Sequence, residues 1–197
     1  DGGAQQAQRV LPGSLARLHG GFPVIVDTRF EAHEYPLHKA QNPPEGGFLD
    51  RYRTNSGAPN GTLSIGHNAY LLQAMNLFYL QTADSRYNAI ARGIADYLLS
   101  LQDADGGIFG MAGVTWKSVE SNLGALSGIH NLGKLQNIPS YVDRASQVRN
   151  FLVMECWNGT RFLRGENDPV IVTDVQGLGG MVLGPAYKNG AYWVEGY

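Results

Sequence analysis

The amino-acid sequence predicts an all-α protein built from repeated helical hairpins. Three observations indicate this fold: apolar residues recur at helical spacing from residue 64 onward, similar segments return after about 54 residues, and glycines concentrate in alternate helices. The chain has 197 residues, 43% of them apolar and 16% charged. This composition is typical of a globular protein, and the length allows one domain with a sizeable core.

Residues 1–63 are rich in Gly, Pro and Asn and show little helical period. We therefore expect an irregular N-terminal arm, with one short helix near 13–19 and one extended run at 22–26. The helical pattern that begins at residue 64 predicts that residues 64–197 form the folded domain.

Charge and motif content exclude several classes of function. The formal net charge is −2 and no block of basic residues occurs, so the chain lacks an electrostatic attraction to nucleic acid. No apolar run approaches the roughly 20 residues that span a membrane. His33, Glu34 and His38 match no metal-binding helix motif, since Pro36 interrupts any helix there. We expect no metal, no cofactor, no nucleic acid and no membrane span.

The first predicted hairpin joins helices at about 65–82 and 85–102. The first helix has one apolar face, formed by Leu71, Met75, Phe78 and Tyr79. The second has an apolar stripe at helical spacing, formed by Ile90, Ile94, Tyr97, Leu98 and Leu101. Each stripe predicts an amphipathic helix with one side toward a core.

The second predicted hairpin joins helices at about 118–136 and 139–157, and a further helix follows at 173–187. Pro139 suits a first helical turn, and an apolar stripe follows it at Tyr141, Ala145, Val148 and Leu152. The only cysteine, Cys156, lies at the end of this stripe, so we expect a buried structural thiol. Pro185 should bend the last helix or end it early.

The spacing between helix starts indicates an internal repeat. From His67 to Glu120 is 53 residues, and from Glu120 to Asp174 is 54. The second helices of the two hairpins keep the same period, since Tyr141 follows Tyr87 by 54 residues. Two full hairpins and the start of a third therefore share one unit.

The distribution of glycine indicates how the hairpins are arranged. The helices at 118–136 and 173–187 carry Gly124, Gly128 and Gly133, and Gly177, Gly179, Gly180 and Gly184. A glycine costs roughly 1 kcal/mol against alanine inside a helix, a cost that close packing can offset. Crowding of inner helices about a central axis, as in an (α/α) toroid, explains the pattern. Five expected helices form an incomplete ring, either a fragment or an open half-ring.

In such a toroid the inner helices would present the side chains at their N-termini to one end of a shared cavity. The polar side chains there are His67, Asn68, Glu120, Asn122, Asp174 and Gln176, and the loops that rim them add Trp116, Trp157 and Asp168. Paired carboxylates among aromatic rings suit sugar chemistry, with one carboxyl as acid and one as base. We predict Glu120 as acid and Asp174 as base, and the other seven as substrate-binding. Helix-end electrostatics alone would also favour carboxylates in first turns.

Three segments resemble the six-hairpin glycosidase superfamily of (α/α) toroids. They are the segment GHNAYLL at residues 66–72, the helix start SVESN at 118–122 and the helix start TDVQ at 173–176. His67 and Ser121 stand where the family pattern would have Asp and His. The resemblance covers about residues 64–188 and implies the toroid and a glycoside hydrolase or polysaccharide lyase.

A second resemblance concerns the loop after the first hairpin. Gln102, with Gly106 and the segment GIFG at 107–110, is similar to the repeat motif of terpene cyclases and protein prenyltransferases, which are also toroids. Ile108 stands where that motif has Trp, and the chain has no aspartate-rich cyclase motif.

These observations favour a secreted or cell-surface protein that acts on a polysaccharide or oligosaccharide. The alternative is a non-catalytic structural subunit, or a glycan-binding protein, on a glycosidase-like scaffold. The open ends of a repeat stack are apolar, so such a chain could form a homo-oligomer through them.

Overall fold

The computed structural model describes residues 46–192 except 52, 57 and 59, and these lie in one compact unit, Lys39–Tyr197. The described residues form helices and no strand, which confirms the prediction of an all-α protein. The helix expected near 13–19, the extended run at 22–26 and residues 33–38 lie outside the described residues. The division of the chain at residue 64 stays a prediction.

The helices follow one another with short connections. In chain order they are α2 (Ile65–Thr82), α3 (Asn88–Ser100), α4 (Val119–Leu135), α5 (Pro139–Met154), α6 (Thr173–Leu183), the 3-10 turn η1 (Pro185–Tyr187) and α7 (Asn189–Tyr192). These bounds agree with the predicted helices to within a few residues. The largest difference is that α6 ends four residues early. Gly184 has a positive φ of 98° and Pro185 cannot donate a helical hydrogen bond, so the helix stops there.

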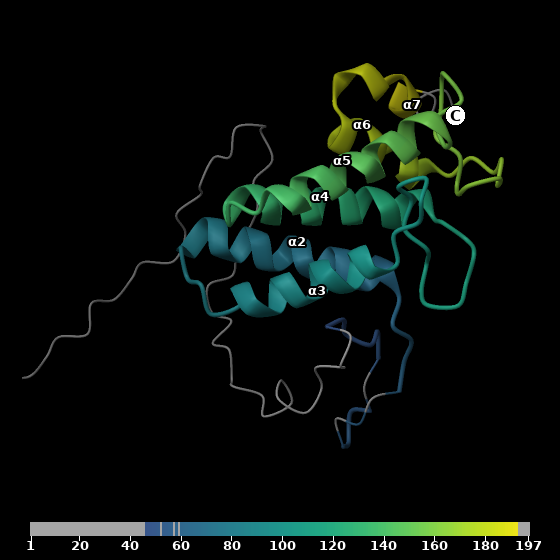
Figure 1. Cartoon of the computed structure of the whole chain (residues 1–197). Coiled ribbons are helices and arrows are strands. Elements are labelled where there is room, and N and C mark those ends of the chain that lie inside the picture. The colour runs from purple at the N-terminus through teal and green to yellow at the C-terminus, as the bar shows by residue number, and fades with distance from the viewer. Residues whose placement is uncertain (1–45, 52, 57, 59, 193–197) are drawn as a thin grey trace, which may run out of the picture. The chain divides into compact units, whose positions relative to one another are not determined.

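The helices pack as successive hairpins in two layers. The first layer is α2, α4 and α6, of which α2 packs against α4 and α4 against α6. In the second layer, α3 packs against α2 and α4, and α5 packs against α4 (Figure 1). None of the helices in the described part of the chain has the length and apolar character that crossing a membrane requires.

Small residues let α4 approach α2 closely. A Cβ atom at Gly128 would lie 3.0 Å from the Leu72 side chain, so no larger residue fits without displacement. Two side-chain amides of α2 use this proximity. Gln73 donates to the carbonyl oxygen of Gly124 at 3.1 Å, and Asn76 donates to that of Gly128 at 2.8 Å. Gly124 and Gly128 therefore allow the two helices to pack closely, and they leave their carbonyl oxygens open to hydrogen bonds from α2.

One apolar core runs between the two layers. Its largest fully buried apolar side chains are Ile65, Leu72, Ile94, Leu98, Ile108, Leu123, Ile129, Leu132, Phe151, Leu152 and Phe162. Cys156 is fully buried in the same core, as predicted. Burial raises the pKa of its thiol to about 12, and the nearby Glu166 charge adds to the effect. The thiol is thus a packing group at neutral pH.

Candidate functional site

The first turns of α2, α4 and α6, with the loops that lead into them, form what we call the N-terminal rim. Backbone hydrogen bonds join its parts in a repeating pattern. The amide of Ile65, at the start of α2, donates to the carbonyl oxygen of Gly110 at 3.0 Å. The amide of Val119, at the start of α4, donates to that of Arg164 at the same distance. Each helix start is therefore attached to the loop that precedes the next helix of its layer.

Each first-layer helix carries a buried carboxamide at its fourth residue. These residues are Asn68 in α2, Asn122 in α4 and Gln176 in α6, and all three are fully buried. The Asn122 oxygen accepts the Ile108 amide at 2.8 Å, and its nitrogen donates to the carbonyl oxygens of Ile108 at 3.0 Å and Ser118 at 2.8 Å. One side chain thus satisfies both backbone groups of a buried loop residue.

The same three bonds recur in the neighbouring helices. Gln176 accepts the Phe162 amide at 2.8 Å and donates to the carbonyl oxygens of Phe162 at 2.8 Å and Val172 at 3.2 Å. Asn68 accepts the Phe48 amide at 2.7 Å and donates to the carbonyl oxygens of Phe48 and Ser64, both at 2.8 Å. Both amide hydrogens of every side chain are donated to backbone groups. We assign these carboxamides to loop anchoring, and their predicted role in substrate binding stays a prediction without support from the geometry.

The anchors also define the register of the helix starts. With Asn68, Asn122 and Gln176 in equivalent positions, the residue of α2 that corresponds to Glu120 is Gly66. The sequence alignment of His67 with Glu120 is therefore wrong by one residue. A contact across the layer is consistent with this register, because a Cβ atom at Gly66 would lie 3.1 Å from the Ser121 hydroxyl oxygen.

Glu120 and Asp174 occupy corresponding positions in the first turns of α4 and α6. The hydroxyl of Tyr70, in α2, donates to Glu120 Oε1 at 2.9 Å. Burial raises the pKa of Tyr70 to about 12, and the hydrogen bond and charge of Glu120 and the charge of Asp174 contribute further. The structure therefore brings both predicted catalytic carboxyls within electrostatic range of one phenol.

Sequence reasoning missed Tyr70 because no equivalent aromatic residue recurs in α4 or α6. The signal that was available is its spacing. Tyr70 lies four residues after Gly66, so both lie on one face of α2. The corresponding faces of α4 and α6 carry Glu120 and Asp174. Gly66 supplies no side chain there, and Tyr70 reaches Glu120 from one turn further along.

Trp116 is the large aromatic side chain exposed on the loop before α4. It is 48% exposed. Its indole lies over two glycines of the rim, since a Cβ atom at Gly165 would be 2.8 Å from Trp116 Nε1 and one at Gly110 would be 3.7 Å from Cε3. The rim therefore holds an indole that is supported on one side and open on the other.

The remaining predicted residues have partners of their own. His67 is exposed, and its Nδ1 lies 2.6 Å from the Ser64 hydroxyl oxygen. Asp168 is paired with Arg164, at 2.7 Å from Nε, and the guanidinium lowers the pKa of that carboxyl. Trp157 stacks within the protein, with its ring centroid 4.6 Å from that of Phe162. The substrate-binding roles of these three residues stay predictions.

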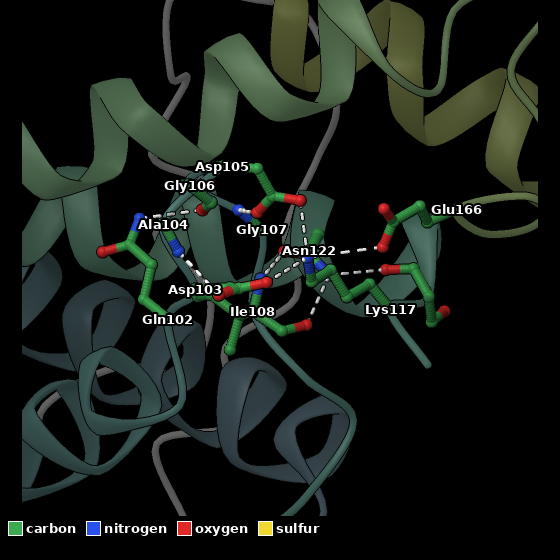
Figure 2. A network of polar contacts seen from close by, with 11 residues as sticks. Gln102, Asp103, Ala104, Asp105, Gly106, Gly107, Ile108, Lys117, Asn122 and Glu166 are labelled. Atoms are coloured by element: carbon green, nitrogen blue, oxygen red, sulfur yellow. Dashed lines mark hydrogen bonds and ion pairs between the residues drawn. The ribbon is translucent and has the colours of Figure 1, made fainter. Parts of the chain in front are cut away.

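A buried ammonium group lies between the loops of the rim. Lys117 is 2% exposed, and its Nζ is 2.8 Å from Asp103, 2.5 Å from Asp105 and 3.3 Å from Glu166 (Figure 2). The two aspartates belong to the loop after α3, and Glu166 belongs to the loop after α5. Lys117 therefore joins the loops of consecutive hairpins through one charge.

Carboxylates keep Lys117 charged, and two aromatic rings lie beside its ammonium group. Its Nζ lies 4.9 Å from the ring centroid of Phe109 and 5.4 Å from that of Phe151. Burial by itself lowers the pKa of this lysine, but hydrogen bonds to Asp103 and Asp105 outweigh burial and raise the pKa above its ordinary value. Among the described residues, no group of three or more His, Cys, Asp or Glu side chains is placed to hold a metal ion.

The loop after α5 is held by aromatic rings. Trp157 pairs with Phe162 as Gln102 pairs with Ile108, so Trp157 corresponds to Gln102 in the repeat. Its ring contacts Phe162 and Tyr187, with centroid separations of 4.6 and 5.3 Å. The loop after α3 thus carries an ion cluster, and the loop after α5 carries an aromatic cluster.

Comparison of the chain with protein-family models, with curated proteins and with solved structures finds no match.

We predict that Asn122→Ala lowers the free energy of unfolding by about 2–4 kcal/mol, because it leaves the buried amide and carbonyl of Ile108 without partners. The matched control is Asn131→Ala, an exposed asparagine on the same helix, which should change stability by less than about 0.5 kcal/mol. Urea unfolding followed by circular dichroism measures both. Equal stability of the two variants would contradict the anchoring role.

A second prediction concerns Lys117 and pH. The hydrogen bond from Lys117, together with one from the Ala104 amide, holds the pKa of Asp103 below its ordinary value of 3.8. A carboxyl with a lowered folded-state pKa stabilises the fold above its unfolded pKa, and this contribution is lost as the pH falls. Stability should therefore decrease between about pH 5 and about pH 2, and decrease less in Lys117→Met.

Urea unfolding at several pH values tests this prediction, with Lys134→Met at the exposed end of α4 as the control. The control should keep the pH dependence of the parent protein. If Lys117→Met kept it as well, Lys117 would not be the group that lowers the pKa of Asp103.

Proposed function

We propose that this chain is a carbohydrate-active protein of the glycoside hydrolase kind, in which Glu120 and Asp174 act as a carboxyl pair. One observation carries the proposal: the two residues occupy corresponding first-turn positions of adjacent helices, and both interact electrostatically with Tyr70. Paired carboxyls at one edge of a rigid scaffold are the groups that glycosidic bond cleavage needs.

The proposed architecture is an incomplete (α/α) toroid of the six-hairpin glycosidase kind. Successive hairpins with a glycine-rich layer support it, as does the linkage of all three helix starts of that layer into one rim. In a toroid this rim would surround the mouth of the central cavity. A polysaccharide or oligosaccharide would enter there, and such substrates favour a secreted or cell-surface location.

In the proposed hydrolysis, Glu120 donates a proton to the glycosidic oxygen as the bond to the anomeric carbon breaks. Asp174 accepts a proton from the water whose oxygen forms the new bond to that carbon. The half-exposed indole of Trp116 provides a flat apolar surface on which a sugar ring can stack. His67, exposed at the start of α2, is the further polar group of this rim that a sugar hydroxyl would reach.

We predict that Glu120→Gln lowers turnover by about 100-fold or more, because the amide cannot transfer a proton, while the fold is kept. Asp174→Asn should have an effect of similar size. The measurement is the release of reducing ends, and of unsaturated sugars by their ultraviolet absorbance, from a panel of neutral and acidic polysaccharides. The unsaturated product would identify a lyase in place of a hydrolase.

The matched control is Glu155→Gln, an exposed glutamate at the end of α5 that belongs to no first turn of the first-layer helices. It should keep the activity of the parent protein. Undiminished turnover in Glu120→Gln, or no turnover of any glycan by the parent protein, would contradict the proposed function.

A second function is favoured by the surface of α6. The Met181 side chain is 74% exposed, and a Cβ atom at Gly177 would meet no described atom within 4 Å. Gly124 and Gly128 of α4, in contrast, are covered by α2. This face of α6 would suit a non-catalytic subunit, or a glycan-binding protein, that self-assembles through the open end of its hairpin stack.

We predict for this second function that light scattering shows a native mass above the monomer that rises with concentration. Met181→Glu should abolish the increase, because it places a charge on the contact surface. Met154→Glu is the matched control, since Met154 is equally exposed but lies at the end of α5. A monomer at every concentration would contradict the assembly function and leave the enzymatic one.

A further inference from the structure

Tyr70 has a polar contact that the packing of its helix does not require. The residue is 44% exposed, so its ring contributes little to the core. Its hydroxyl nevertheless donates to Glu120 Oε1 at 2.9 Å, across the contact between α2 and α4. The two neighbouring bonds across the same contact, from Gln73 and Asn76, end on backbone oxygens. Of these three bonds, only the one from Tyr70 ends on a titratable group.

We propose that Tyr70 is a positioning residue of the carboxyl pair, which holds Glu120 by one oxygen and leaves the other oxygen to react. This inference rests on the proposed function and assigns to one atom the proton that Glu120 would transfer. Since Oε1 accepts from Tyr70, a protonated Glu120 carries its proton on Oε2. The phenol also fixes the rotation of the carboxyl group about its last bond, which is otherwise free at a partly exposed glutamate.

The phenol can hold this position across the working range of pH. A tyrosine hydroxyl that lost its proton would repel Glu120 instead of bonding to it. Burial, the Glu120 hydrogen bond and the charges of Glu120 and Asp174 raise the Tyr70 pKa to about 12, so the donor is retained at neutral pH. Asp174 in α6 is the other charged group that acts on the phenol.

The protein offers an internal reference for this pair. Tyr141 of α5 donates to Asp96 of α3 at 2.6 Å, and burial together with that hydrogen bond raises its pKa as well. The Tyr141 pair lies between second-layer helices and not at the N-terminal rim. It should therefore be insensitive to changes at Glu120 and Asp174.

The test is a titration of the full chain with tyrosines labelled at Cζ, followed by carbon NMR and without any substrate. At about pH 11 a phenol with a pKa of about 12 is roughly one-tenth ionised, whereas one with a pKa of about 10 is roughly nine-tenths ionised. Glu120→Gln should lower the Tyr70 pKa, and Asp174→Asn should lower it by less. Neither change should move Tyr141, and Glu155→Gln should move neither tyrosine.

Tyr70→Phe provides the functional readout on any glycan that the parent protein turns over. It keeps the ring and should lower kcat by about tenfold with KM nearly unchanged, whereas Tyr141→Phe should leave both constants as they are. A Tyr70 pKa that is the same in the parent protein and in Glu120→Gln would overturn the inference, even with activity present. If no glycan is turned over, the proposed function fails and the titration alone decides whether Tyr70 holds Glu120.

Discussion

A buried carboxamide at the fourth residue of each first-layer helix is the interaction on which the rest of the structure depends. Hairpins that stack side by side leave a loop residue pressed against the next helix start, where water cannot satisfy its backbone groups. One carboxamide offers an acceptor and two donors, so it pairs with both groups of that residue and with the carbonyl one turn earlier. Asn68, Asn122 and Gln176 do this in three consecutive helices. The longer side chain of Gln176 serves as well as asparagine.

Because the anchors hold the loops, they also determine what lies at the rim. The first-turn residues two positions before each anchor are Gly66, Glu120 and Asp174, and the loop that Asn122 holds leads on to Trp116. The two loops differ in what else holds them. The loop after α3 carries the Lys117 ion cluster, and the loop after α5 carries Trp157 with its aromatic neighbours. The carboxamide anchor is the part that both loops share.

The proposed site arises where the repeat is broken. A perfect repeat would place the same side chain at position 66 as at 120 and 174, and three carboxylates would then repel one another. Glycine at 66 removes one of them, and Tyr70 donates a hydrogen bond to Glu120 from one turn further along α2. Repetition thus builds the scaffold, and departures from it create groups with distinct chemical roles.

The sequence by itself determined the helices, their bounds to within a few residues, the period of the repeat and the burial of Cys156, because apolar spacing and Pro and Gly positions act locally along the chain. It also located the cluster of polar residues at the helix starts. What it could not decide is which of these face inward: Asn122 and Glu120 are equally polar and two residues apart, yet the first is fully buried and the second partly exposed. The one-residue register, the burial of Lys117 and the reach of Tyr70 to Glu120 were decided only by the tertiary structure. Each depends on which backbone groups and charges lie nearby in the folded chain. The loop residues that the carboxamides bind are 14 or 20 positions away, the carboxylates around Lys117 are 12 to 49 positions away, and Glu120 is 50 positions from Tyr70.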